Sequence, residues 1–226
     1  MRIPRRVAAA LPPTTVGDPP LGAADCERIR VGPIGQPANA TSAAWLTVAG
    51  AWIVWRHRHH DHAALVGAVV AAAGIGSVAY HGPGGRLSGW AHDATIAAML
   101  GVISLEDVIE VRPDLTPVAT PVYAVAMAAV GLVLAARPDT VRAVSALLAG
   151  SAVVAEVSAR RLARGGTGRA HRLAEGLMAS ALIAYLAGRT GAPTCRPDSW
   201  IQPHGLWHTL SGAAMAAWAQ ACLGEG

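Results

Sequence analysis

The sequence predicts an all-α integral membrane protein, a bundle of seven transmembrane helices. Composition is the first observation, because 53% of the 226 residues are hydrophobic and only 14% are charged. A soluble domain carries about 25% charged residues, so this chain lacks the polar groups that a water-facing surface requires. The second observation is a series of seven apolar stretches, each close to the roughly 20 residues that a helix needs to cross a bilayer.

The seven stretches follow one another with short polar connections. They lie near residues 40–56, 63–81, 91–110, 118–136, 141–159, 171–188 and 203–223. Residues 118–136 and 203–223 contain no Asp, Glu or Arg, whereas acidic residues crowd both ends of 91–110. Frequent glycine and alanine suit close helix packing in lipid. We expect one domain over residues 25–226, preceded by a disordered tail over residues 1–24, where Pro12, Pro13, Pro19 and Pro20 interrupt any signal-peptide segment.

The positive charges come entirely from arginine and indicate an orientation. Eight arginines fall in the loops after the first, third and fifth stretches, namely Arg56, Arg58, Arg112, Arg160, Arg161, Arg164, Arg169 and Arg172. The alternate loops hold five, namely Arg86, Arg137, Arg142, Arg189 and Arg196. By the positive-inside rule, the N-terminus is predicted to be extracytoplasmic. The arginines form no patch, so nucleic-acid binding is not indicated.

Polar residues gather where three of the predicted helices meet one face of the membrane. Ser77 and His81 end the second helix, Asp93 begins the third, and His204 and His208 begin the seventh. In a seven-span chain these three helix ends lie on the same side. Residues four apart share a helix face, and ionisable groups in a membrane usually face the bundle interior. We therefore expect these five side chains to converge.

Their residue types suit metal-dependent hydrolysis. Three neutral imidazoles, from His81, His204 and His208, with an open fourth position are typical of catalytic zinc, which acidifies a bound water and polarises a carbonyl. Asp93 could deprotonate that water and then protonate a leaving nitrogen. Ser77 could donate a hydrogen bond to the oxyanion. The predicted substrate is an amide or ester whose lipid tail lies between the helices.

The sequence resembles the alkaline ceramidases, members of the CREST superfamily of seven-span membrane hydrolases. The matching motifs are Ser77-x3-His81, Asp93, His204-x3-His208, Cys26-Glu27 and Asn39-x-x-Ser42. The resemblance implies that the three histidines hold Zn²⁺ and that the aspartate and serine complete the active site. It also implies that ceramide, or a related lipid amide, is cut to a sphingoid base and a fatty acid. A disulfide between Cys26 and Cys195 is implied too.

The chain departs from the family pattern in two places. The connection from His81 to Asp93 is one residue longer than expected and contains Gly-Pro-Gly-Gly, and the family's acidic Asp-Glu-Leu-Pro stretch is absent. In the family's N-terminal calcium site, Glu27 matches a ligand, but neutral or basic residues replace several others. We therefore expect no calcium.

Other interpretations remain open at this point. A seven-span sensor similar to the adiponectin receptors could hold structural zinc, and paired membrane histidines can also bind haem. Ser77 could bond its own helix, and Asp93 could merely cap the third helix. The His-rich run 56–62 could bind metal but is better explained as a cytoplasmic loop. A retinal protein is excluded, because a chain without lysine cannot form the Schiff base.

Overall fold

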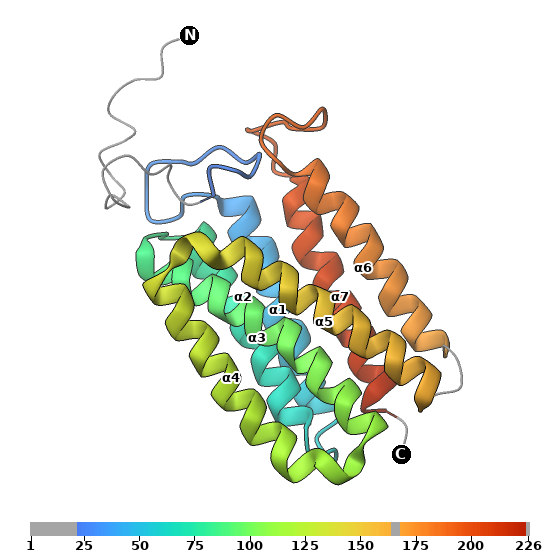
Figure 1. The fold of residues 1–226 in the computed structure, drawn as a ribbon. Helices are drawn as coiled ribbons and strands as arrows, with labels where there is room; N and C mark the ends of the chain where they lie inside the picture. Colours follow the sequence, from blue (N-terminus) through green and yellow to red (C-terminus); the bar gives the residue numbers. More distant parts are fainter. Residues whose placement is uncertain (1–21, 164–167, 225–226) are drawn as a thin grey trace.

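A computed structural model describes residues 22–163 and 168–224, and these residues are helical throughout the body of the fold (Figure 1). The predicted all-α class is confirmed. Most of the predicted disordered tail, residues 1–21, lies outside the described residues.

Seven α-helices of 19–26 residues form the described part of the chain. They are α1 (Pro37–Arg56), α2 (Ala63–His81), α3 (Arg86–Val111), α4 (Thr116–Ala136), α5 (Val141–Leu162), α6 (Arg169–Ala187) and α7 (Pro203–Cys222). Two short 3₁₀ turns, Pro113–Leu115 and Pro138–Thr140, lead into α4 and α5. Each predicted stretch coincides with one helix, although α3 begins five residues earlier than predicted.

The early start of α3 follows from the glycine-rich turn after α2. Gly84 and Gly85 have φ values of 67° and 92°, in the region that residues with a Cβ rarely adopt. The chain therefore reverses within Gly82–Gly85, and the next helix begins directly at Arg86.

Three of the described helices are long and apolar enough to cross a membrane. They are Ala63–His81, Pro113–Ala136 and Pro138–Leu162, the last two including their 3₁₀ turns. Large apolar side chains on the outer helices are also exposed; Val125 on α4, Leu147 on α5 and Ile183 on α6 are each at least 70% exposed. Such surfaces suit contact with lipid. These features indicate a membrane protein.

The core lies between α1, α2, α3 and α7. Helix α1 packs against α2 and α7, α7 packs against α6, and α3 packs against α2, α4 and α5. Leu46, Val66, Val102 and Met215 represent the four central helices in the buried cluster. Figure 1 shows the helices side by side, with the N-terminal segment and the α6–α7 connection at the same end of the bundle. This end carries the predicted site.

Glycine sets the separation of α1 and α2. A Cβ added at Gly67 would lie 2.6 Å from the carbonyl oxygen of Gly50 and 2.5 Å from a methyl of Val54. The two backbones are therefore in contact, as in small-residue helix interfaces in membranes.

We predict that Gly67→Ala destabilises the fold, because the added methyl forces α1 and α2 apart at a cost of about 1–3 kcal/mol. Thermal unfolding of the detergent-solubilised protein measures the effect. Gly150→Ala on α5 is the matched control, since its added Cβ would meet no atom within 4 Å. Equal unfolding temperatures for the two variants would contradict the close-packing interpretation.

Candidate metal centre

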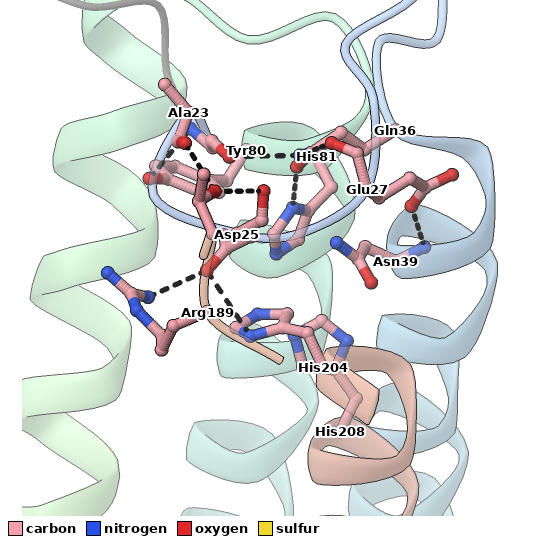
Figure 2. A network of polar contacts seen from close by, with 12 residues as sticks. Ala23, Asp25, Glu27, Gln36, Asn39, Tyr80, His81, Arg189, His204 and His208 are labelled. Atoms are coloured by element: carbon pink, nitrogen blue, oxygen red, sulfur yellow. Dashed lines mark hydrogen bonds and ion pairs between the residues drawn. The ribbon is translucent and has the colours of Figure 1, made fainter. Parts of the chain in front are cut away.

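Three buried histidines meet at one end of the bundle. His81 is the last residue of α2, and His204 and His208 lie in the first two turns of α7. One ring nitrogen of each lies within 4.8 Å of the others, so the group could hold a metal ion. The ring centroids are 4.7–5.1 Å apart, and each residue is at most 5% exposed. The predicted convergence of the histidines is confirmed (Figure 2).

Local sequence features bring α7 to this position. Pro203 occupies the first turn of α7, where its missing N–H costs no hydrogen bond. The spacing of four residues then places His204 and His208 on one face. Gly188, just after α6, allows the close approach, since a Cβ there would lie 2.5 Å from the backbone nitrogen of His204.

Contact with Gln36 determines which nitrogen of the His81 ring carries the hydrogen. His81 Nδ1 lies 2.7 Å from Gln36 Oε1. The Gln36 amide nitrogen donates to the carbonyl oxygens of Gly22 and Glu27, at 3.0 and 2.8 Å, which sets the orientation of the amide. An amide oxygen only accepts, so Nδ1 of His81 carries the hydrogen and Nε2 keeps its lone pair. That Nε2 atom is buried without a hydrogen-bond partner among the described residues.

Contact with Ser42 determines the tautomer of His208 in the same way. Ser42 Oγ lies 3.0 Å from His208 Nδ1 and donates its own hydrogen to the Asn39 carbonyl oxygen at 2.9 Å. The hydroxyl oxygen can therefore accept from Nδ1–H, which leaves the lone pair of His208 on Nε2. The Asn39-x-x-Ser42 motif thus contributes to the site through this contact.

The group beside His204 is a carboxylate to which no sequence motif pointed, and His204 Nδ1 makes no hydrogen bond among the described residues. Asp25 Oδ1 lies 3.4 Å from His204 Nδ1 and accepts a 2.7 Å hydrogen bond from Arg189 Nη1 (Figure 2). Burial raises the pKa of Asp25 to about 6, although the nearby Arg189 and His92 lower it. The only signal in the sequence was its position next to Cys26.

The three histidines are better suited to binding a metal ion than to packing in a core without one. Three imidazole rings point buried nitrogen atoms at one another, and at least the Nε2 of His81 has no donor to satisfy it. Buried polar atoms without partners are costly, whereas a shared cation would satisfy all three lone pairs. Neutral imidazole is a ligand typical of zinc and related metals.

Ser77 and Asp93 lie outside the group of possible ligands. Ser77 is buried one turn before His81, and its hydroxyl donates to the Ala73 carbonyl oxygen at 2.8 Å. Asp93 Oδ1 lies 2.9 Å from His92 Nδ1. Because α3 begins at Arg86, Asp93 lies inside the helix and is not its cap. The catalytic roles of Ser77 and Asp93 remain predictions.

Aromatic contacts connect Asp93 to the metal centre. The His92 ring stacks on Tyr80 with centroids 4.5 Å apart, and Tyr80 meets the His81 ring edge-on at 4.9 Å. His92 therefore contacts the ligand group through Tyr80.

Glu27 caps the first helix. Its two carboxylate oxygens accept hydrogen bonds from the backbone N–H groups of Ala38 and Asn39, both at 2.8 Å. Burial raises the pKa of Glu27, and these two backbone donors lower it. A carboxylate also interacts favourably with the positive end of the helix dipole. The residue that matches a calcium ligand of the family thus stabilises the start of α1 in this structure.

The disulfide implied by the resemblance is present. Cys26 and Cys195 are bonded across 169 residues of chain. Beside them, the Cys26 N–H donates to the Gly188 carbonyl at 2.8 Å and the Thr190 N–H donates to Ala24 at 2.9 Å. The N-terminal segment is therefore attached to the α6–α7 connection next to the histidines.

The His-rich run after α1 lies in the connection to α2. Its residue His62 pairs with the buried carboxylate of Glu106, Nδ1 to Oε1, at 2.8 Å. Among residues 22–163 and 168–224, His81, His204 and His208 form the group that could hold a metal ion, and the run contributes none of its members.

No protein-family model, no curated protein and no solved structure matches this chain.

We predict that replacing Cys26 and Cys195 together with serine destabilises the protein by about 2–4 kcal/mol, because the disulfide restricts a very long loop in the unfolded chain. Thermal unfolding of the double variant in detergent measures the loss. Cys222→Ser is the control, since Cys222 is outside the disulfide. The interpretation fails if unmodified protein, kept from air oxidation, carries two free thiols at positions 26 and 195.

Proposed function

We propose that this protein is a zinc-dependent integral membrane hydrolase that cleaves a lipid amide bond, as ceramidases cleave ceramide to a sphingoid base and a fatty acid. The observation that carries the proposal is the buried group of His81, His204 and His208, whose ring nitrogens lie within 4.8 Å of one another. For His81 and His208, the partner at Nδ1 leaves the second ring nitrogen for a metal ion.

Zinc and a catalytic role agree best with this ligand set. Structural zinc usually has four protein ligands, whereas catalytic zinc keeps one position open. Zinc at such a site polarises a carbonyl and lowers the pKa of a water molecule towards about 7. The three histidines hold and orient the ion, and the N-terminal segment covers them.

The membrane setting supports a lipid substrate. Three helices are apolar enough to span a bilayer, and apolar side chains cover the exposed faces of α4, α5 and α6. We propose that all seven helices are embedded, with polar groups of the other four facing one another. The arginine distribution and the disulfide both favour an extracytoplasmic site, since disulfides persist in oxidising compartments.

Two polar side chains complete the proposed chemistry. Asp93 removes a proton from the attacking water and returns it to the leaving amine nitrogen, and its contact with His92 holds the carboxylate in place. Ser77 lies one turn from His81 and donates a hydrogen bond to the developing oxyanion once its hydroxyl rotates away from Ala73.

The ring geometry favours a single metal ion over haem. Two axial histidines must lie on opposite sides of a haem plane, with the macrocycle between their rings. Here the three rings contact one another edge to face, with centroids 4.7–5.1 Å apart. A sensor with structural zinc would share the same three ligands and is separated from the proposal by turnover of lipid amides.

We predict that the purified protein contains about one zinc ion per chain and releases fatty acid from ceramide in detergent micelles. His208→Ala should abolish both properties, because it removes one of three ligands. Elemental analysis and fatty-acid release measure them. The control is His59→Ala, an exposed histidine of the α1–α2 connection. Full zinc content in His208→Ala would overturn the metal assignment, and zinc without turnover of any lipid amide or ester would favour the sensor.

We predict that Asp93→Asn and Ser77→Ala keep zinc but lose activity. Loss of the general acid–base group should lower kcat by about 10²–10⁴-fold, and loss of one oxyanion donor by about 10²–10³-fold. Zinc content and fatty-acid release are measured on the same preparations. Wild-type kcat in either variant would remove that residue from the mechanism.

A further inference from the structure

The three histidines differ in the group that lies beside their Nδ1 atom, and Nδ1 of His204 makes no hydrogen bond among the described residues. His81 faces the amide oxygen of Gln36, and His208 faces the hydroxyl of Ser42. Only His204 faces a carboxylate, that of Asp25. A negative charge beside an imidazole has a stronger effect on its nitrogen donors than a neutral acceptor has.

Asp25 is held rigidly, although it lies outside the helices. It is 5% exposed, and its backbone forms an antiparallel bridge with Arg189. The neighbouring residue Cys26 is fixed by the disulfide to Cys195. The Thr190 hydroxyl also donates to the Asp25 carbonyl oxygen at 3.0 Å. The carboxylate therefore has little freedom to leave His204.

Arg189 accounts for the burial of this carboxylate without removing it from His204. Its guanidinium donates to Asp25 Oδ1 at 2.7 Å and stacks over the Tyr185 ring at 5.0 Å. The Tyr185 ring in turn lies 5.9 Å from that of His204. The ion pair reduces the cost of burying the charge, and the same Oδ1 atom lies 3.4 Å from Nδ1 of His204.

From this geometry we infer that Asp25 is a positioning residue for the metal centre: in the metal-bound protein its carboxylate, now 3.4 Å from Nδ1 of His204, accepts the hydrogen of that atom and so presents Nε2 to the ion. The inference rests on the metal centre of the proposed function. Carboxylates that hold ligand histidines in this way fix the tautomer and ring orientation and raise the basicity of the nitrogen donor. Asp25 itself is not among the residues that could ligate the ion.

The test compares two variants that break the same ion pair. Asp25→Asn removes the negative charge beside His204, whereas Arg189→Gln leaves that carboxylate in place. Because Arg189 lowers the pKa of Asp25, which is about 6, both variants are measured well above neutral pH, where the carboxylate stays ionised without the arginine. Zinc affinity is measured by competition with a chromogenic chelator on the full-length protein in detergent. Removing a carboxylate beside a metal-bound histidine typically costs about 10–100-fold in affinity, and we expect this loss for Asp25→Asn. Arg189→Gln should bind zinc within about threefold of the unmodified protein.

Further readouts separate positioning from simple stabilisation. The visible spectrum of the Co²⁺-loaded protein reports ligand geometry, so it should change in Asp25→Asn and stay unchanged in Arg189→Gln. Thermal unfolding of the metal-free proteins shows how much each variant destabilises the fold. If the ion pair only stabilises the fold, both variants lose stability and zinc affinity to the same extent, which overturns the inference.

Failure of the inference and failure of the proposed function give different results. Unchanged zinc affinity and an unchanged cobalt spectrum in Asp25→Asn, with affinity abolished in His208→Ala, would refute the role of Asp25 while the metal centre stands. An unmodified protein that binds no zinc would overturn both. Loss of zinc affinity in Asp25→Asn alone supports the inference even if the lipid substrate is not ceramide.

Discussion

Three imidazole rings packed at the end of an apolar bundle impose the main constraint on this structure. Each ring has one N–H that needs an acceptor and one lone pair that needs a donor or a cation, and leaving either unmet in a buried site is costly. The N-terminal segment and the first turns of α1 supply the groups beside Nδ1, with Gln36 and Ser42 in hydrogen-bond contact with His81 and His208 and Asp25 3.4 Å from His204. A metal ion shared by the three rings would satisfy the lone pairs.

The path of the chain before α1 follows from this constraint. Gln36 donates to two backbone carbonyls and faces His81, so one side chain orders both the loop and the ligand. Glu27 caps α1, and the disulfide attaches the segment to the connection that leads into α7. Helix start, loop and metal ligands are thus coupled, and a change in one affects the others. Such support around a site limits its ligands to one geometry.

Two groups of helices in the bundle differ in what they contact. Helices α1, α2, α3 and α7 make the buried core and carry the histidines, and close glycine contacts such as Gly50 with Gly67 hold their backbones together. Helices α4 and α5 pack on α3 and expose apolar side chains, as lipid-facing helices do. The histidines lie at one end of the first group.

The sequence by itself determined the number and order of the helices, because apolar stretches of about 20 residues are a strong signal. It also placed His81, His204 and His208 together, since helices that alternate in direction bring those ends to one side. It did not determine which groups would face the rings. Asp25 lies far from His204 along the chain, and only the tertiary pairing of residues 24–26 with 188–190 brings the carboxylate to the ring. The true start of α3 likewise depended on left-handed glycines, a backbone conformation that apolar patterning does not report. The periodicity of apolar residues predicts the helices and the residues that share a helix face. Contacts between loops distant in sequence follow from the packing of the whole chain.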